Sequence, residues 1–274
     1  WRRRGLAVMK IGVVGCAGRM GRMLLETILS TDGLSLSGGI EHTGNDAIGC
    51  DVATLIGGDA TGILVGGDAA ALFAASDAVI DFTVPMATVM HARLAADTGT
   101  ILVVGTTGMD ADQLVQLQAA GQQTTIVHAG NMSVGINLLE GLVQQVSAVL
   151  GNDYDIEVVE MHHRHKIDAP SGTALMLGEA AAAGRGVDLG AVSQRTRDGH
   201  TGARTPGDIG FANLRGGDVV GDHTVIFAGD GERIEITHKA SSRTIYAAGA
   251  MRAALWAKDQ APGLYSMKDV LGMA

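Results

Sequence analysis

Aromatic residues, cysteine and long apolar runs are all scarce in this 274-residue sequence. Only 3% of the residues are aromatic although 46% are hydrophobic, so Ala, Val, Ile, Leu and Met must fill the core. Cys16 and Cys50 are too few for a disulfide framework and form no CxxC pair, which favours a reducing cytoplasm. No apolar run looks long enough to span a membrane, so we expect no membrane association.

Basic residues are also in deficit, because 20 Lys and Arg stand against 29 Asp and Glu, for a net charge of −9. This balance gives no general attraction to nucleic acid, although a local basic site could still bind a small anion. The basic start, Arg2 to Arg4, lacks the apolar stretch that follows in a secretory signal. Residues 9–15 look like a natural beginning, so we expect residues 1–8 to be a leader or an artificial addition.

Proline is rare, with 4 residues, whereas glycine is abundant, with 40. No Gly-X-Y period is present, which excludes a collagen-like chain. The glycines instead follow short apolar runs, which is typical of tight turns between strands and helices. The first half predicts strands at 9–14, 34–40, 78–82, 101–104 and 126–128, and helices at 21–30, 86–97 and 110–121. This alternation predicts a Rossmann-type, doubly wound parallel sheet in an α/β domain over residues 9–132.

The pattern changes in the second half, where strand-like runs follow one another with glycine turns between them. We expect helices at 133–150, 171–183 and 243–258, and strands at 153–162, 209–215, 219–228 and 231–240. Strands joined by short turns favour an open mixed or antiparallel sheet, so residues 133–240 are predicted to form an α+β domain. The polar stretch 185–208 is expected to be a surface loop.

A glycine loop follows the first predicted strand directly. Gly15, Gly18 and Gly21 have the spacing GxxGxxG, and a predicted helix follows. Such a loop lets the backbone approach a pyrophosphate, which the helix N-terminus can then bind. Glu41, after the second strand, is placed to hold the ribose hydroxyls of a dinucleotide. The alternative is a glycine-rich turn beside a solvated glutamate.

The residue after Glu41 bears on the choice of cofactor. NADP-selective sites usually place Arg or Lys there, whereas this chain has His42, which is only partly charged at neutral pH. We therefore expect NADH to be favoured over NADPH, although Arg19 could still reach a 2′-phosphate.

Two further loops follow predicted strands of the same sheet, at 81–85 and 105–108. Ligands of open parallel sheets bind beyond the carboxyl ends of the strands. The Gly-Thr-Thr-Gly loop offers backbone and hydroxyl groups that suit a nicotinamide carboxamide, or it is an ordinary strand-to-helix turn.

The segment 160–173 gathers histidines and a lysine at the end of a predicted strand. Strand alternation places His162 on the same face as Glu160, and His163 on the other face. A zinc site and a solvated basic turn are alternatives, but the H-H-x-H spacing lacks a metal-binding register. Ser171 can cap the next helix and Gly172 leaves backbone N–H groups accessible, which suits a carboxylate. With Lys166 as counter-charge, the segment indicates a small polycarboxylate substrate and a histidine that moves a proton.

These motifs resemble the 4-hydroxy-tetrahydrodipicolinate (dihydrodipicolinate) reductase family, in order from about Met9 to Trp256. The similar strings are 15–21, 81–83, 105–108, 131–135, 160–173, 221–224 and 234–243. The resemblance implies an NAD(P)H-dependent reduction of a small cyclic dicarboxylate in the diaminopimelate route to lysine, without a metal. It also implies that residues 241–274 complete the dinucleotide-binding domain. The second domain would then bind substrate and join four subunits into a homotetramer.

The resemblance also assigns roles to single residues. His162 and Lys166 are the expected catalytic residues, His162 as general acid and Lys166 at a substrate carboxylate. Further substrate contacts are expected from His163, Ser171, Gly172, Thr173 and Arg243. The loops described above and the resemblance together predict the residues that bind the cofactor. They are Gly15, Gly18, Arg19, Met20, Gly21, Glu41, His42, Phe82, Gly105, Thr106, Thr107, Asn131 and Met132.

The chain departs from the family pattern at His42 and Val84, where arginine is common. Both departures remove positive charge near the adenosine end and agree with a reduced need for a 2′-phosphate. Two rivals stay open. A semialdehyde dehydrogenase relative would need a catalytic cysteine, which neither Cys16 nor Cys50 is placed to supply. A non-catalytic dinucleotide-sensing protein would not need His162 and Lys166.

Overall fold

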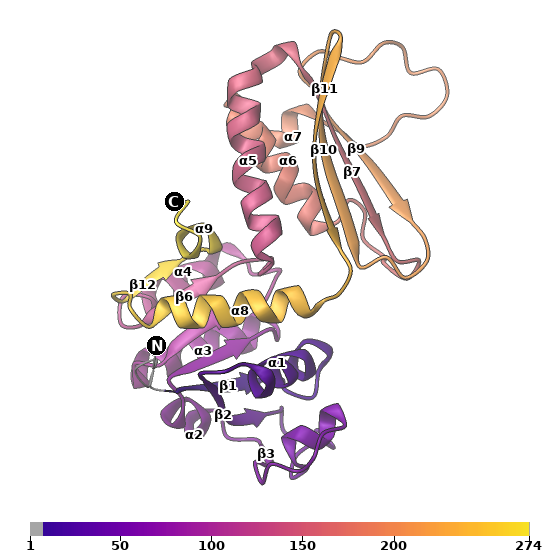
Figure 1. Cartoon of the computed structure of the whole chain (residues 1–274). Coiled ribbons are helices and arrows are strands. Elements are labelled where there is room, and N and C mark those ends of the chain that lie inside the picture. Colours follow the sequence, from indigo (N-terminus) through magenta and orange to yellow (C-terminus); the bar gives the residue numbers. More distant parts are fainter. Residues whose placement is uncertain (1–7, 274) are drawn as a thin grey trace, which may run out of the picture. The chain divides into compact units, whose positions relative to one another are not determined.

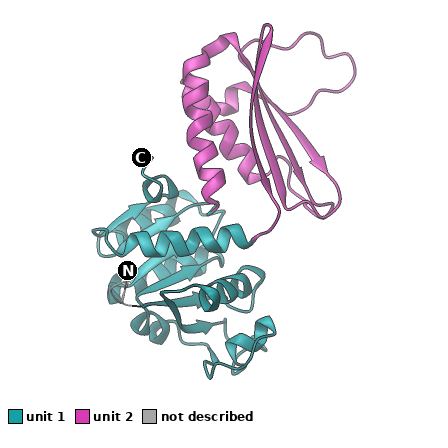
Figure 2. Ribbon diagram, viewed as in Figure 1, with its two compact units in different colours: residues 1–132, 244–274 teal, residues 133–243 magenta. Residues whose placement is uncertain are grey.

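The chain forms two compact units in the computed structural model, which describes residues 8–273. Unit 1 comprises the chain up to Met132 and again from Thr244 onward, and unit 2 comprises Ser133–Arg243 (Figure 2). Residues 1–7 of the expected leader lie outside the described residues.

Unit 1 is built on a seven-stranded sheet with the strand order β12-β6-β5-β4-β1-β2-β3 (Figure 1). Every pairing in it is parallel. The strands are β1 (Met9–Val14), β2 (Leu34–Ile40), β3 (Val65–Gly66), β4 (Ala78–Asp81), β5 (Ile101–Val104), β6 (Thr125–His128) and β12 (Gly263–Tyr265). The strand order reverses direction at β1, where β2 lies on one side and β4 on the other. The predicted doubly wound sheet is therefore confirmed.

Helices cover both faces of this sheet. They are α1 (Arg19–Ser30), α2 (Ala69–Ala75), α3 (Pro85–Thr98), α4 (Ala111–Ala120), α8 (Thr244–Ala257) and α9 (Met267–Val270), with a 3-10 turn η1 (Val52–Ile56). The helices α1 and α8 contact each other, while α3 contacts both α2 and α4. All four residues of β4 are buried, and the first three of them are apolar, as expected for a central strand that is covered on both faces. The sequence analysis missed α2, β3, β12 and α9.

Unit 2 is a five-stranded sheet with helices against one face. Its elements are α5 (Val134–Leu150), η2 (Gly151–Asp153), β7 (Asp155–His162), α6 (Gly172–Arg185), α7 (Leu189–Val192), β8 (Ser193–Gln194), β9 (Ile209–Arg215), β10 (Gly221–Gly229) and β11 (Glu232–Ala240). The strand order is β11-β10-β7-β9-β8. The pairs β7–β9 and β8–β9 are parallel, whereas β10 is antiparallel to both of its neighbours. The expectation of an open mixed sheet is confirmed.

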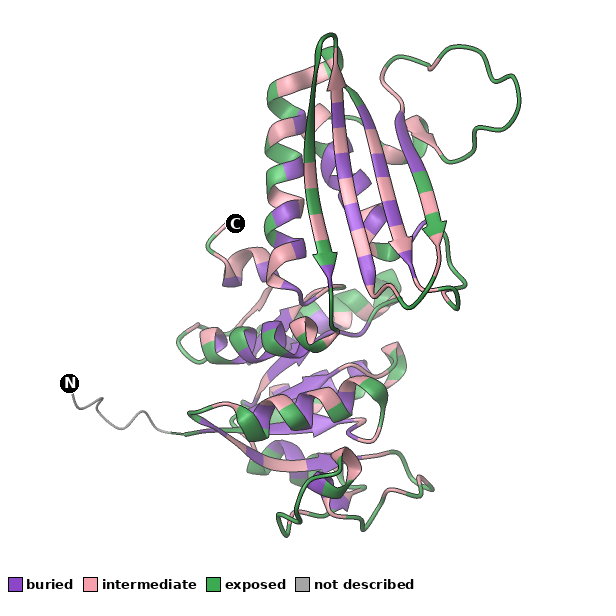
Figure 3. Cartoon of the chain, turned by 45° about the vertical axis from the view of Figure 1, so that its right-hand side comes forward, coloured by how far each residue is buried: buried purple, intermediate pink, exposed green. Residues whose placement is uncertain are grey.

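Alternation along the strands separates the two faces of this sheet, as the banding of β10 in Figure 3 shows. On the inner face, Val158 pairs with Phe211 on one side and Val225 on the other. These three residues belong to the buried core that α5 and α6 complete.

One rung nearer the end of β7, the inner face becomes polar. Glu160 pairs with Asn213 and with His223, and His223 pairs with His238. The same sheet face therefore supplies an apolar core and, next to it, a row of polar groups.

The segment 185–208 is more ordered than the surface loop expected from the sequence, because it contains α7 and β8. Two arginines in the rest of this segment form hydrogen bonds with acidic residues of β7. Arg197 donates two hydrogen bonds to Glu157, at 2.9 and 2.7 Å. Arg204 donates to the Asp155 carboxylate at 2.8 Å.

One helical segment of the described chain, Val134–Asp153, has the length and apolar composition of a membrane span, with a mean hydropathy of 1.2. The sequence analysis did not expect such a segment. A single helix of this kind is weak evidence, because core helices of soluble proteins meet the same criterion. Leu139 and Val143 of this helix are buried in the core of unit 2.

Candidate active site

The glycine loop of unit 1 connects β1 to α1. Gly15 has a φ of 65°, which side-chain-bearing residues rarely adopt, and its N–H donates to the Ile40 carbonyl at 2.9 Å. A side chain on Gly21 would clash with the Gly15 carbonyl, so the start of α1 packs closely on the loop. Gly18 is the N-cap of α1 and no side chain caps this helix. The first amides of α1 are therefore suited to bind an anion.

Glu41 at the end of β2 contacts the same loop. Its Oε1 accepts a hydrogen bond from the Ala17 N–H at 2.9 Å, and its Oε2 accepts one from Asn45 at 3.2 Å. Each carboxylate oxygen keeps a lone pair for a ribose hydroxyl. Arg19 and His42 are both exposed, and His42 Nδ1 lies 3.1 Å from the Thr43 carbonyl oxygen.

Asp81, at the end of β4, links the two further loops of unit 1. The carboxylate is fully buried and accepts hydrogen bonds from the Thr83 N–H at 2.8 Å and from His91 Nδ1 at 2.8 Å. Thr106 of the second loop lies 3.3 Å from the same carboxylate. Burial by itself raises the pKa of Asp81, but the bonds from His91 and Thr83 outweigh it and lower the pKa below its usual value. The sequence analysis assigned no role to Asp81 or His91.

The predicted nicotinamide loops are held by close packing. A side chain on Gly105 would clash with the ring of Phe82, so this position must be glycine for the two loops to approach. Thr106 is buried and accepts a hydrogen bond from Thr88 at 2.8 Å, whereas Thr107 is exposed.

Among the remaining expected cofactor residues, Met20 and Asn131 are half-buried. Met132 is completely buried, so its side chain belongs to the core and only its backbone could face a ligand. The four strand ends β1, β2, β4 and β5 lie at one edge of a parallel sheet. Free helix amides, an acidic ribose partner and two close loops at that edge fit a dinucleotide.

In unit 2, His162 lies in a network of ionic hydrogen bonds at the end of β7. Its Nδ1 is 2.5 Å from Oε2 of Glu160, which confirms that these two side chains share a face. Arg215 of β9 donates to both oxygens of Glu160, at 2.8 Å each. Burial raises the pKa of Glu160, yet the bonds from Arg215 and His162 together lower it below its ordinary value. Glu160 is therefore an anion that fixes the imidazole ring of His162.

The start of α6 lies against this network. Ser171 Oγ accepts a hydrogen bond from the Ala174 N–H at 3.1 Å, as its predicted capping role requires. The Ser171 N–H donates to Glu160 at 3.3 Å. Ser171 Oγ also lies 3.2 Å from Nε2 of His223, whose ring centre is 5.0 Å from that of His162. Burial, followed by the charge of His162, lowers the pKa of His223 to about 4, so this ring is neutral near pH 7.

The turn after His162 carries the expected carboxylate ligands. Lys166 Nζ lies 2.8 Å from Oδ1 of Asp168, an ion pair that the sequence analysis did not predict. His163 is half-buried, and desolvation, then the positive charge of Arg243, lower its pKa. Gly172 is exposed, with open space where a side chain would stand, so a ligand can approach the first turn of α6.

Thr173, the third residue of this expected carboxylate turn, is half-buried in α6. Sequence reasoning missed Arg215 and the buried His223 as parts of this network. His223 lies in the similar string 221–224 but had no assigned role, and Arg215 was known only as part of a predicted strand, because the partners lie far apart in the chain.

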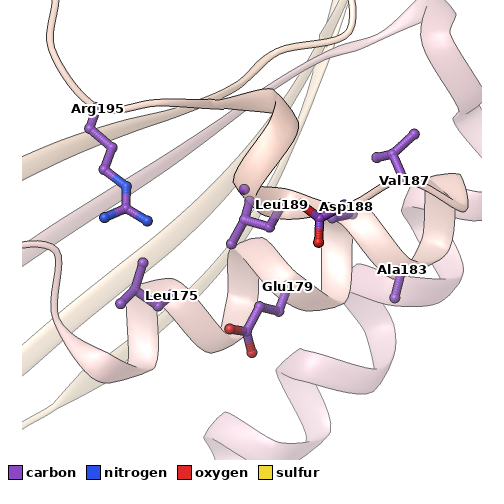
Figure 4. Close-up of a pocket in the computed structure, with 9 residues that line it drawn as sticks. Leu175, Glu179, Ala183, Val187, Asp188, Leu189 and Arg195 are labelled. Atoms are coloured by element: carbon purple, nitrogen blue, oxygen red, sulfur yellow. The ribbon is translucent and has the colours of Figure 1, made fainter.

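Within residues 8–273, no group of three or more His, Cys, Asp or Glu is arranged to hold a metal ion. A hollow of about 440 Å³ lies on the flank of α6 and α7. Figure 4 shows the residues that line it. The hollow is lined by Glu179, Asp188 and Arg195 with apolar neighbours, and it contains none of the expected substrate-binding residues.

Comparison with known families covers nearly all of the chain. A family profile described as "Dihydrodipicolinate reductase, N-terminus" matches residues 9–132, and one described as "Dihydrodipicolinate reductase, C-terminus" matches residues 135–271. The chain belongs to the dihydrodipicolinate reductase family. The family, the oxidoreductase class and the NAD(P)H-type nucleotide-binding fold expected from the sequence are thereby confirmed.

Curated relatives of this reductase family are similar over their whole length. The 4-hydroxy-tetrahydrodipicolinate reductase of Dinoroseobacter shibae is 56% identical over 96% of this chain and 98% of its own length. That of Roseobacter denitrificans is 56% identical over 97% of each. Among solved structures, the dipicolinate-bound dihydrodipicolinate reductase from Paenisporosarcina sp. TG-14 superposes with a TM-score of 0.74. It is 20% identical and covers 94% of this chain and 97% of its own, so it supports the fold alone.

Proposed function

We propose that this chain reduces 4-hydroxy-tetrahydrodipicolinate to tetrahydrodipicolinate with NADH or NADPH, in the cytoplasmic diaminopimelate route to lysine. The names of its full-length relatives support this substrate. The observation that carries the proposal is the Arg215–Glu160–His162 network, which holds an imidazole at the end of β7 beside a cationic turn.

The 4-hydroxyl group leaves as water together with a hydrogen of a neighbouring ring carbon, and the reduction adds a hydride and a proton to the ring. A bound reduced nicotinamide supplies the hydride. His162 supplies or relays the proton through Nε2, because Nδ1 is committed to the Glu160 carboxylate. His223 cannot share this role near pH 7, since its pKa of about 4 keeps it neutral.

The substrate carboxylates are held by the turn and the helix that follow His162. Lys166 and Arg243 supply positive charge, and after desolvation the charges of Arg243 and Lys166 are among the causes that lower the pKa of His163. The turn at Ser171, Gly172 and Thr173 forms the N-terminus of α6, whose partial positive charge favours a carboxylate. Lys166 would exchange its Asp168 partner for a substrate carboxylate.

The cofactor is held by the unit 1 loops, with the pyrophosphate at the Gly15–Gly21 turn and the ribose at Glu41. NADH is favoured over NADPH, because His42 and Val84, both exposed, place no fixed positive charge near the adenosine end. Arg19, which is exposed, could still reach a 2′-phosphate. A preference for NADPH of a hundredfold or more in kcat/KM would overturn this part of the proposal.

We further propose a homotetramer that forms through the outer face of the unit 2 sheet. Met161 and Leu214 pair across β7 and β9 on this face, opposite the face that carries Glu160. Leu214 is 49% exposed, so burial in a subunit contact would remove apolar surface from water. Light scattering of Leu214→Glu should show smaller species than wild type, and a monomeric wild type would refute the assembly.

The test is a coupled assay in which dihydrodipicolinate synthase makes the substrate from pyruvate and aspartate semialdehyde. Oxidation of NADH and of NADPH is followed in parallel at about 340 nm, the nicotinamide absorbance. His162→Ala should lower kcat by about 10²–10⁴-fold with little change in KM. His200→Ala, at an exposed loop position, is the control and should retain wild-type kcat. No synthase-dependent oxidation by folded wild-type protein would refute the activity.

A further inference from the structure

We propose that Arg215 is a positioning residue for this reaction: it holds the imidazole of His162 through Glu160, and it holds the Lys166 turn through the Asp168 carbonyl. This inference rests on the proposed function, in which His162 moves the proton. Nothing in the sequence pattern pointed to Arg215, because it lies on a different strand from the histidine segment.

The register of the sheet places Arg215 directly beside His162, which lies on the strand that also carries Glu160. Arg215 is the last residue of β9, and its cross-strand partner on β7 is His162 itself. Its two terminal nitrogens donate separately to the two oxygens of Glu160, at 2.8 Å each. This paired geometry needs the planar fork of a guanidinium, which a lysine ammonium cannot reproduce.

The pairing matters because Glu160 is almost completely buried, with 1% of its surface exposed. A buried carboxylate is stable as an anion only when its oxygens are hydrogen-bonded and its charge is paired. Without Arg215, Glu160 would keep two hydrogen-bond partners among the described residues. These are His162 and, through a longer bond of 3.3 Å, the Ser171 N–H. Arg215 is thus the only formally cationic side chain, among those described, that bonds to this carboxylate.

The charge state of Glu160 determines which nitrogen of His162 is available. A carboxylate can only accept a hydrogen bond, so His162 must carry its hydrogen on Nδ1. Nε2 is then the atom that exchanges a proton. Gly221 faces this atom, since an added side chain would begin only 3.0 Å from His162 Nε2. A neutral Glu160 could donate instead of accepting, and the ring would lose its fixed tautomer.

Arg215 also fastens the turn that carries the proposed carboxylate ligands. Its Nη2 donates to the Asp168 carbonyl at 2.6 Å, and the Asp168 side chain holds Lys166 at 2.8 Å. A single guanidinium therefore connects the proton-moving histidine with the lysine that faces the substrate. Its loss should disturb catalysis at both places without removing any group that touches substrate.

A second arginine–glutamate pair on β7 offers a matched control. Arg197 also donates two hydrogen bonds to a glutamate of β7, at 2.9 and 2.7 Å, and that glutamate is Glu157. Glu157 lies an odd number of residues from Glu160, so it faces the opposite side of the sheet. None of the hydrogen bonds described for Glu157 involves a histidine. Arg197→Lys therefore tests the loss of an arginine–glutamate fork on β7 without touching His162.

The experiment compares full-length wild type, Arg215→Lys, Arg215→Ala and Arg197→Lys in the coupled assay, after circular dichroism has shown that each is folded. We expect Arg215→Lys to lower kcat at least tenfold with an unchanged KM for the dinucleotide, and Arg197→Lys to match wild type. Added guanidinium should restore part of the kcat of Arg215→Ala, whereas methylammonium should not. Nitrogen NMR of labelled histidine should show His162 with its hydrogen on Nδ1 in wild type and a mixture in Arg215→Ala.

Wild-type kcat in Arg215→Lys, an equal loss in Arg197→Lys, or no rescue by guanidinium would overturn the positioning role. An unchanged His162 tautomer in Arg215→Ala would do the same. These outcomes differ from failure of the proposed function, in which wild type itself shows no synthase-dependent turnover.

Discussion

Acidification should destabilise this protein through one buried histidine, His223. Only 4% of its surface is exposed, and burial is the main reason that its pKa falls from 6.5 to about 4. Electrostatic interaction with the nearby His162 ring adds to this lowering of the pKa of His223, whereas Glu160 opposes it. The folded protein therefore keeps His223 neutral at a pH where an unfolded chain would protonate it.

The sign and size follow from the two pKa values. Well above pH 6.5 neither state binds the proton, and the full stability is present. As the pH falls toward 4, the unfolded state binds a proton that the folded state refuses, so the free energy of unfolding decreases. From pH 7 to pH 5 the loss due to this one group should be about 2 kcal/mol, and about 3 kcal/mol by pH 4.

The assay is urea unfolding at a fixed protein concentration, at several pH values between 7.5 and 4.5, for wild type and His223→Gln. Glutamine keeps a nitrogen near Ser171 Oγ, 3.2 Å from His223 Nε2 in the wild type, but it does not titrate. The difference between the two proteins isolates His223 from other acid-sensitive groups. If both proteins lost the same stability between pH 7 and pH 5, His223 would not be neutralised by burial and the reasoning would be wrong.

Three further predictions concern other parts of the molecule. Lys166→Ala should lower kcat/KM by roughly 10- to 150-fold in the coupled assay, because a charged hydrogen-bond partner of the substrate is lost; unchanged kinetics would give Lys166 a purely structural role. A thiol reagent at pH 8 should modify exposed Cys50 and spare Cys16, whose pKa burial raises to about 12, as mass spectrometry of the folded protein would show. Equal labelling rates would contradict the burial of Cys16. Gly249→Ala should lower the free energy of unfolding by about 1–3 kcal/mol in urea, because the added methyl group would clash with the Met132 carbonyl; wild-type stability would show that the backbone relaxes there.

Local patterns predicted the long elements well. The bounds of β1, β2 and β9 agree with the predicted 9–14, 34–40 and 209–215. Each of these strands reads as a continuous or alternating apolar run between turn residues, so its own sequence is sufficient. The helices α5 and α6 were placed to within two residues for the same reason.

The short elements were missed because their stability comes from their neighbours. The strand β12 has only three residues, Gly263–Tyr265, and it forms by pairing with Thr125–Val127 of β6, far away in the chain. Likewise, β3 consists of Val65–Gly66 and extends the sheet beside β2. Segments of this length carry too little periodic signal to be recognised on their own.

The candidate site likewise contains residues that local sequence placed correctly and residues that only the sheet brought together. Strand alternation was enough to place Glu160 and His162 on one face, and helix-capping rules were enough to assign Ser171 its place. The partners Arg215 and His223 come from β9 and β10, and their meeting with Glu160 depends on the register between strands.

By itself, the sequence determined the family, the doubly wound sheet, the glycine loop and the histidine segment, because each is written in residues that are neighbours along the chain. Only the tertiary structure decided which charges meet: Arg215 with Glu160, His91 with Asp81 and Lys166 with Asp168. The physical reason is that periodicity fixes the direction of a side chain relative to its own strand or helix. The partner across the sheet is fixed only when the apolar rows of Val158, Phe211 and Val225 pack into one core and set the register.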